Sequence, residues 1–299
     1  MELPNVNGGT KRYGWLVCAV GATSLLHLPE AMAQSAVPSK AAPVHALNAP
    51  GTEPDTEAMP DGDGKWVLGL TASATPSYAG ASDRQWGIRP VLAGRVGRWM
   101  VSTSSARRLA GLSLAGGIST TVVDSDRWQL GVGVRLTHGR DSADNPLLTG
   151  LPDVPGSVAI RASSHWVLTP TWRVTGSLQQ DLQRGQGLHA TVGLGWSRRL
   201  ASGWTLDAGS GVTWANAPAM NTFYGVLADQ TRAGRSAWQP GAGLEQWHWG
   251  VGASRALSAH WRFAASVGRS TLLGGAAHSP LTVQRSGTTA QVSLAYVGW

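Results

Sequence analysis

Stretches of strict apolar–polar alternation run through this chain of 299 residues. From Trp128 to Thr137, every second residue is Trp, Leu or Val, and the residues between them are Gln, Gly, Arg and Thr. A period of two is that of a β-strand whose two faces meet different surroundings. Similar stretches begin near Trp66, Trp86, Trp99, Leu109, Val158, Trp172, Leu188, Trp204, Gly243, Trp261 and Thr288. The pattern predicts an all-β chain of about twelve strands, with ten as the alternative.

The length and chemistry of these strands point to a bilayer. They are about ten residues long, twice the usual globular strand and long enough to cross a membrane when tilted. Their second face carries Gly, Ser, Thr, Gln and isolated Arg, which suits a narrow hydrated lumen better than the charged exterior of a soluble sandwich or lipocalin-like barrel. Tryptophans recur near the strand ends, where an aromatic girdle belongs. Since lipid tolerates no open sheet edge, we expect a closed antiparallel transmembrane β-barrel of the outer-membrane type.

The chain before this barrel divides into two further segments. In residues 1–33, Lys11 and Arg12 precede an apolar run, and Ala31-Met32-Ala33 resembles a cleavage site, which predicts a signal peptide rather than a membrane anchor. Residues 34–64 form a flexible acidic periplasmic segment rich in Ala and Pro. Residues 65–299 are the predicted barrel. Cys18 is the one cysteine, so after cleavage no disulfide or thiol chemistry is available.

Charge is sparse and unevenly distributed. Only 14% of residues are charged, which argues against an ordinary cytoplasmic enzyme. From residue 65 onward, 21 basic residues stand against 10 acidic ones, a net charge of +11. Strand parity predicts a basic set inside the lumen: Arg89, Arg95, Arg135, Arg161, Arg173 and Arg262. Because unpaired arginine is costly in a dry interior, this set should meet either the inward acids Asp181 and Asp207 together with water, or anions or an acidic partner that enters the lumen.

The acidic segment offers one such partner. Its carboxylates, which directly precede the first strand, are Glu53, Asp55, Glu57, Asp61 and Asp63. They could fold back as a plug on a basic barrel mouth. A nucleic-acid partner is not expected for a chain placed in the outer membrane, despite its basic charge.

Catalytic constellations are sparse. Parity places His165, His189, Asp181 and Asp207 on the lumen face, where an acid–base group is conceivable, but such residues more often fill and hydrate a lumen. No cysteine cluster or paired histidine spacing indicates a metal site, and we expect no cofactor and no enzymatic activity.

Four loop motifs resemble those of the MipA/OmpV family of outer-membrane proteins. They lie between predicted strands, and their order and spacing carry the resemblance over residues 65–299. They are Pro76-Ser77-Tyr78-Ala79-Gly80-Ala81-Ser82-Asp83, Arg140-Asp141 with Leu148-Thr149-Gly150-Leu151-Pro152-Asp153-Val154, Tyr224-Gly225-Val226, and Ser279-Pro280-Leu281. Ala81 stands where the family pattern leads us to expect Gly. By themselves, the glycines of these motifs indicate turns and the prolines indicate strand ends.

The resemblance implies a non-enzymatic structural protein. A family member is described as a scaffold that joins a membrane-bound lytic transglycosylase to a murein synthase, and others are described as porin-like or adhesive. The alternative from the residues is a narrow, anion-preferring channel, and a barrel enzyme is the least favoured hypothesis. The motifs lie in the predicted outer loops, so a periplasmic scaffold would have to use residues 34–64 or the short turns. Outer-loop arginines at positions 107, 108, 232 and 235 could contact lipopolysaccharide phosphates.

Overall fold

The computed structural model describes residues 66–102, 117–137, 139–183, 187–232 and 234–298. The predicted signal peptide and acidic segment, residues 1–33 and 34–64, lie outside the described residues. So does Leu109, near which a strand was expected; the strand in this part of the chain is described from Gly117 onward.

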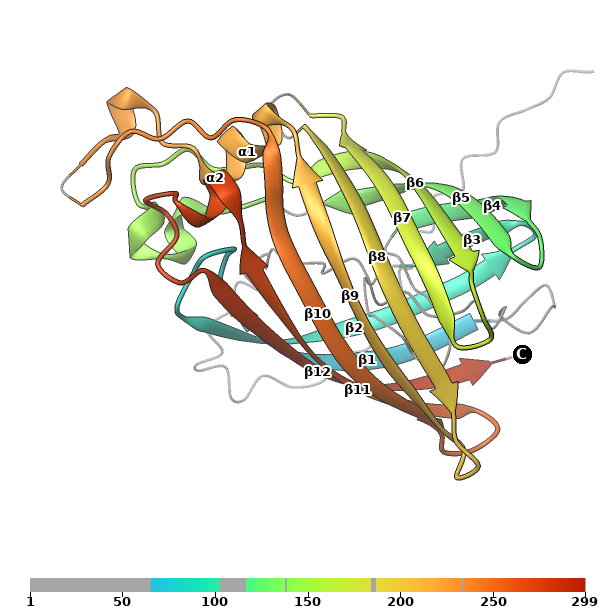
Figure 1. Ribbon diagram of the computed structural model, residues 1–299. Helices are drawn as coiled ribbons and strands as arrows, with labels where there is room; N and C mark the ends of the chain where they lie inside the picture. Colours follow the sequence, from blue (N-terminus) through green and yellow to red (C-terminus); the bar gives the residue numbers. More distant parts are fainter. Residues whose placement is uncertain (1–65, 103–116, 138, 184–186, 233, 299) are drawn as a thin grey trace, which may run out of the picture. The chain divides into compact units, whose positions relative to one another are not determined.

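Twelve antiparallel strands make a closed ring in the described part of the chain (Figure 1). They are β1 (Trp66–Pro76), β2 (Arg84–Val96), β3 (Trp99–Ser102), β4 (Gly117–Asp124), β5 (Trp128–Thr137), β6 (Ser157–Val167), β7 (Trp172–Asp181), β8 (Leu188–Arg199), β9 (Trp204–Ala215), β10 (Gly243–Ala256), β11 (Trp261–Leu272) and β12 (Ser286–Gly298). Each strand pairs with its neighbours in sequence, and β12 returns to β1. The predicted closed antiparallel barrel of twelve strands is confirmed.

The barrel closes between its first and last strands. The ladder runs from Trp66 opposite Gly298 to Ala74 opposite Ala290. Gly69 lies opposite Ala295, and a Cβ at Gly69 would come within 2.6 Å of the Leu294 carbonyl oxygen. The closing ladder therefore depends on the absence of a side chain at position 69.

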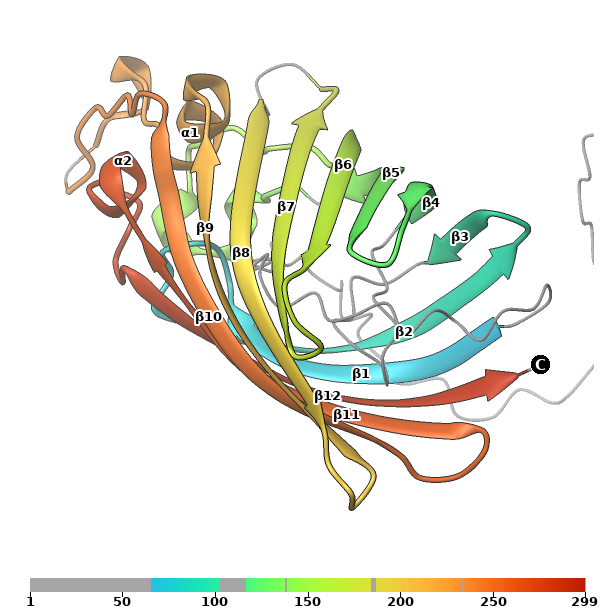
Figure 2. The same ribbon diagram turned by 45° about the vertical axis from the view of Figure 1, so that its right-hand side comes forward.

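The two ends of the barrel differ in the length of their connections. Both chain ends of the barrel, Trp66 and Gly298, lie at the end with tight turns, such as the one between β8 and β9. The opposite end carries the long loops and the short helices, which Figure 2 shows beyond the strand ends. These helices are α1 (Ala217–Tyr224), α2 (Gly274–Ala277) and the 3-10 turns η1 (Ser142–Asp144), η2 (Pro146–Leu148) and η3 (Ala228–Gln230). Among the described residues, no helix has the length and apolar character needed to span a membrane.

Side chains alternate between an apolar outer face and a polar inner face. On β2, Trp86 and Ile88 are 83% and 75% exposed, whereas Val91 is fully buried on the other face. On β1, Leu68 and Leu70 are exposed on the outer face. Thr71 lies on the inner face, where it is buried and its hydroxyl is hydrogen-bonded to the Ser293 hydroxyl at 2.7 Å. An outer wall of exposed Leu, Val, Ile and Trp would be unfavourable in water and is the surface that a transmembrane barrel presents to lipid.

Tryptophans mark both rims of this outer wall. At the end with tight turns, Trp66, Trp99, Trp128, Trp172 and Trp261 are the first residues of their strands and are all exposed. At the other end, Trp86, Trp214, Trp247 and Trp249 are exposed. Indole N–H groups find partners on the wall: Trp128 Nε1 donates to Ser164 Oγ at 2.7 Å. Aromatic belts at two levels are typical of a barrel whose rims lie at membrane interfaces.

Candidate functional site

The long loops pack together into one structure at a single end of the barrel. We call it the cap: residues 77–83, 139–156, 216–232, 234–242 and 273–285. One buried apolar cluster joins four of its loops, with Tyr78, Leu148, Val226 and Leu281 all less than 5% exposed. The Tyr78 hydroxyl donates to the Leu281 carbonyl at 3.0 Å, which links the first loop to the last. Loops that are far apart in sequence thus share a small core.

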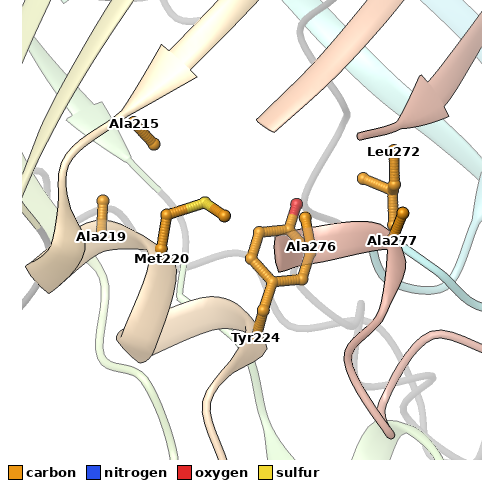
Figure 3. Packing of buried hydrophobic residues seen from close by; sticks show 7 residues of the cluster. All are labelled: Ala215, Ala219, Met220, Tyr224, Leu272, Ala276 and Ala277. Atoms are coloured by element: carbon orange, nitrogen blue, oxygen red, sulfur yellow. The ribbon is translucent and has the colours of Figure 1, made fainter. Parts of the chain in front are cut away.

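A second cluster attaches the cap to the barrel wall. Met220 and Tyr224 on α1 pack near Ala276 and Ala277 on α2, with Ala215 and Leu272 at the adjoining strand ends (Figure 3). Asn216 caps the start of α1, and its Oδ1 accepts hydrogen bonds from the backbone N–H groups of Ala219 and Leu188. An Asn at this position satisfies free donors at the start of a helix, and here it also bonds the first residue of β8.

Three arginines stabilise the cap through backbone carbonyls. Arg235 is 5% exposed and donates to the carbonyls of Leu147, Thr149 and Gln230 at 2.7–3.1 Å. Arg232 donates to the carbonyls of Pro146 and Leu147. Burial lowers the pKa of Arg235, and the nearby Arg232 lowers it further. These two guanidinium groups therefore crosslink the loops of the cap. Their contact with lipopolysaccharide stays a prediction, and residues 107 and 108 lie outside the described residues.

Arg140 is the third arginine. It is 6% exposed, its Nη1 donates to the Phe223 carbonyl at 2.8 Å, and its backbone pairs with Val154. Burial lowers its pKa, which Tyr78, Tyr224 and Asp153 partly offset. The neighbouring acids of the same motif shape the loop: Asp141 accepts from the Ala143 N–H and Asp153 accepts from the Ser142 N–H.

The remaining motif residues also lie in the cap. Asp83 accepts from the Ser77 hydroxyl at 2.8 Å and from the Asn145 amide at 3.0 Å. Gly80 has φ +105°, a left-handed conformation that favours glycine, and its carbonyl accepts from two N–H groups of the last loop. Gly225 has an ordinary φ of −77°, but a Cβ there would come within 2.3 Å of the Asn221 carbonyl oxygen. Crowding, and not a left-handed turn, requires glycine at position 225.

The last motif binds α1 directly. The Ser279 hydroxyl donates to the Tyr224 carbonyl at 2.7 Å, and Pro280 is half-buried beside it. All ten motif residues predicted from the sequence therefore lie in or beside the cap: Tyr78, Gly80, Asp83, Arg140, Asp141, Asp153, Tyr224, Gly225, Ser279 and Pro280.

A buried carboxylate connects the cap to the barrel wall. Glu245 accepts from the Tyr224 hydroxyl at 2.9 Å and lies 3.1 Å from Nδ1 of His189 on β8. Burial and Glu245 raise the pKa of Tyr224 well above its ordinary value. Glu245 is not among the residues predicted from the sequence. The sequence pattern that could have indicated Glu245 is a break in the apolar–polar alternation, because Leu244 and Trp247 are three residues apart and both face outward. The ladder between β10 and β9 shifts register there, in a β-bulge.

The six predicted lumen arginines occupy positions that alternate with the exposed apolar residues of their strands. Five are half-buried, and Arg173 is 2% exposed. The Arg173 side chain lies against Gly195 of β8: a Cβ at Gly195 would be 3.2 Å from its Nε. Arg135 Nη1 donates to the Gln179 amide oxygen at 3.4 Å. Gln179 pairs with Arg161 in the ladder between β6 and β7, so both Arg135 and Arg161 lie near Gln179. Arg262 and Arg95 bond turn carbonyls at the end with tight turns.

The predicted inward acids are bonded to neighbouring strands. Asp181 is 6% exposed and accepts from the Thr137 hydroxyl at 3.1 Å, and Asp207 is 5% exposed and accepts from the Ser197 hydroxyl at 2.8 Å. His165 lies on β6 opposite Gln129 and Thr175, and is not brought next to His189 by any ladder. Of the four residues considered for acid–base chemistry, Asp181 and His189 interact electrostatically, since Gln179 pairs with His189 and Asp181 follows Gln179 by two residues on the same face. His165 and Asp207 lie elsewhere on the wall, and the described residues hold no cluster of three or more potential metal ligands.

A cavity of ≈ 330 Å³ opens within the cap between the loop that follows β5 and α1. Its walls include Arg140, Asp153, Asn221, Thr222 and Gln230, together with backbone and apolar groups. The Nε of Arg140 has no hydrogen-bond partner among the described residues. The cap therefore has a recess of the size of a small ligand, lined by both polar and apolar groups and built largely from the motif residues.

Solved structures with a similar form are outer-membrane barrels. A NanC porin aligns with a TM-score of 0.43 and 7% identity over 77% of this chain and 98% of its own. A KdgM porin aligns at 0.39 and 8% over the same shares. An outer membrane channel from Pseudomonas putida F1 aligns at 0.42 and 14% over 82% of this chain and 98% of its own. The fold of this chain follows from its own strand pairing.

Comparison by sequence gives a family. No curated protein matches the sequence. The family model described as MltA-interacting protein MipA matches residues 68–298, which include nearly the whole barrel and all four loops that carry the motifs. The chain therefore belongs to the MipA family.

Proposed function

We propose that this barrel lies in the outer membrane of a Gram-negative bacterium, with the cap outside and the end with tight turns in the periplasm. The exposed apolar wall between two tryptophan rims supports a transmembrane position. The difference in loop length supports the orientation, since such barrels have short periplasmic turns and longer outer loops. In this proposal residues 1–33 direct export, and residues 34–64 lie in the periplasm before β1.

We propose, further, that the protein is a non-catalytic scaffold for murein-remodelling enzymes. The observation that carries this proposal is the match to the MipA family, whose description names interaction with MltA. The partners would be a lytic transglycosylase and, through it, a murein synthase. The tight turns offer little surface for a partner. The contact would therefore use the acidic residues 34–64, or the turns around Gly97, Ser202 and Ser258. The motif residues would act structurally, by shaping the cap.

Co-purification from outer membranes tests the scaffold. Protein extracted in mild detergent with a tag in the cap should carry a murein hydrolase or synthase in stoichiometric amount. Deletion of residues 34–63 should remove this partner, whereas Arg232→Gln, a change at the opposite end, should retain it. Recovery of the barrel without any murein enzyme would contradict the scaffold.

A second function, a narrow anion-preferring passage, is favoured by the inward arginines. The predicted inward set holds six arginines and two aspartates, and cations lining a narrow polar lumen attract anions. Bilayer conductance of the purified protein should be anion-selective. Replacing Arg135 and Arg161 together with Gln should reduce that selectivity, while Arg255→Gln, on the outer face, should leave it unchanged. A higher conductance after deletion of residues 34–63 would support a plug, and no conductance in either form would reject the passage.

A further inference from the structure

Two arginines project from the lipid-facing wall at the capped end. Arg84 on β2 and Arg269 on β11 are exposed and share the parity of the outward residues Trp86 and Val267. Strands β11, β12, β1 and β2 are neighbours in the ring (Figure 1). The two arginines therefore lie on one stretch of wall.

Strand register places them in one row. Arg269 pairs with Thr288 of β12, and Arg84 pairs with Pro76 of β1. Extending the ladder beyond Ala74 and Ala290 by two residues sets Pro76 opposite Thr288. Three strand spacings then separate the arginines, which is about 14 Å between their Cα atoms. Side chains as long as those of arginine can meet two groups of one large headgroup across this distance.

Neither arginine is used by the protein itself. Among the described residues, neither side chain forms a hydrogen bond or an ion pair, unlike the side chains of the cap arginines. The closest acid along the chain, Asp83, already accepts from Ser77 and Asn145. A cation without a partner on an apolar wall is unfavourable inside the hydrocarbon layer, and its cost falls to near zero at the interface.

Neighbouring tryptophans indicate the depth of these two arginines in the membrane. Trp249 pairs with Arg269 in the ladder, and Trp86 follows Arg84 by two residues on the outward face. Since tryptophan is enriched at the level of lipid headgroups, both guanidinium groups lie where headgroup phosphates are found. Guanidinium recognises phosphate through paired charge-assisted hydrogen bonds.

We propose that Arg84 and Arg269 form a binding site for the phosphate groups of lipopolysaccharide in the outer leaflet. The proposal rests on the proposed orientation, in which the capped end faces outward. It places a site for lipopolysaccharide on the wall of the barrel between β11 and β2, in addition to the contact predicted for the loop arginines.

Native mass spectrometry of the full chain in detergent tests the site. The probes are lipid A with two phosphates and the same lipid after removal of both. The double variant R84Q/R269Q should bind the phosphorylated lipid about tenfold more weakly than the unaltered protein. The dephosphorylated lipid should bind both proteins equally and weakly. The control is R255Q, which removes an outward arginine stacked on Trp204 at the opposite end and should bind normally.

The outcomes separate the site from the proposed orientation. Equal binding of phosphorylated lipid by R84Q/R269Q and the unaltered protein overturns the site. Equal affinity of the unaltered protein for the phosphorylated and the dephosphorylated lipid also overturns it. Loss of binding in R255Q alone would overturn both the site and the outward cap. Each variant is first checked for heat-modifiable migration, which reports a closed barrel, and the single variants R84Q and R269Q are measured if the double variant does not fold. Membrane fractionation of the same proteins tests the outer-membrane location independently.

Discussion

Among single side chains, Tyr78 should report on the cap through its ionisation. Burial, with a contribution from Asp83, raises its pKa to about 12. The unfolded chain, with an ordinary tyrosine pKa of about 10, releases this proton earlier. Its contribution to the free energy of unfolding is therefore complete below pH 10 and is lost as the pH rises from about 10 to about 12. In an absorbance titration of tyrosinate, Tyr78→Phe should remove a step near pH 12, and complete ionisation of the unaltered protein by pH 10.5 would contradict the prediction.

Glu245 is the second side chain with a measurable role. Its replacement by Ala leaves the Tyr224 hydroxyl and the His189 ring without their shared acceptor, both in a largely buried position. Removing one partner of a buried charged group should lower the stability of the cap by about 2–4 kcal/mol. Hydrogen exchange of the α1 amides measures this change. Glu245→Gln keeps an acceptor for Tyr224 and should lose less; equal exchange in all three proteins would exclude a stabilising role.

Of the secondary-structure elements, α1 depends on a glycine outside it. Gly187 has φ +72°, and a Cβ there would come within 2.3 Å of Asn216 Oδ1 and 2.5 Å of the Ala219 nitrogen. Gly187→Ala should therefore displace the Asn216 side chain from the start of α1 and weaken the cap by about 1–3 kcal/mol. The matched control is Gly176→Ala on β7, where nothing lies within 4 Å. Faster proteolysis within residues 216–232 only in Gly187→Ala is the expected result.

Closure of the whole barrel depends on the ladder between β1 and β12. Gly69→Val would press a branched side chain against the Leu294 carbonyl and Ala295. We expect most of this variant to fail to close, and heat-modifiable migration in gels measures the closed fraction. Gly87→Ala, whose Cβ would meet only the Ser73 hydroxyl at 3.9 Å, should close normally. Normal closure of Gly69→Val would show that the ladder can shift to admit the side chain.

Much of the ring could be predicted from the sequence because alternation is a local property. The stretch from Trp128 to Thr137 has the face assignment that burial shows, and so does the stretch that begins at Leu188. The cap could not be predicted in this way. The contact of Glu245 with Tyr224 and His189 joins three segments through a bulge, and Arg232 and Arg235 find carbonyls more than 80 residues away. Such pairings depend on tertiary packing and leave no periodic signal.

The carbonyl bonds of Arg232 and Arg235 have a consequence for surface variation. Every residue type offers the same backbone carbonyl, so these bonds place no demand on the side chains at positions 147 and 149. This loop of the cap can therefore change the chemistry that its exposed side chains present while keeping its shape. Substitutions of the exposed residues in that loop should be tolerated, whereas loss of either arginine should weaken the attachment of the loop to residues 230–235.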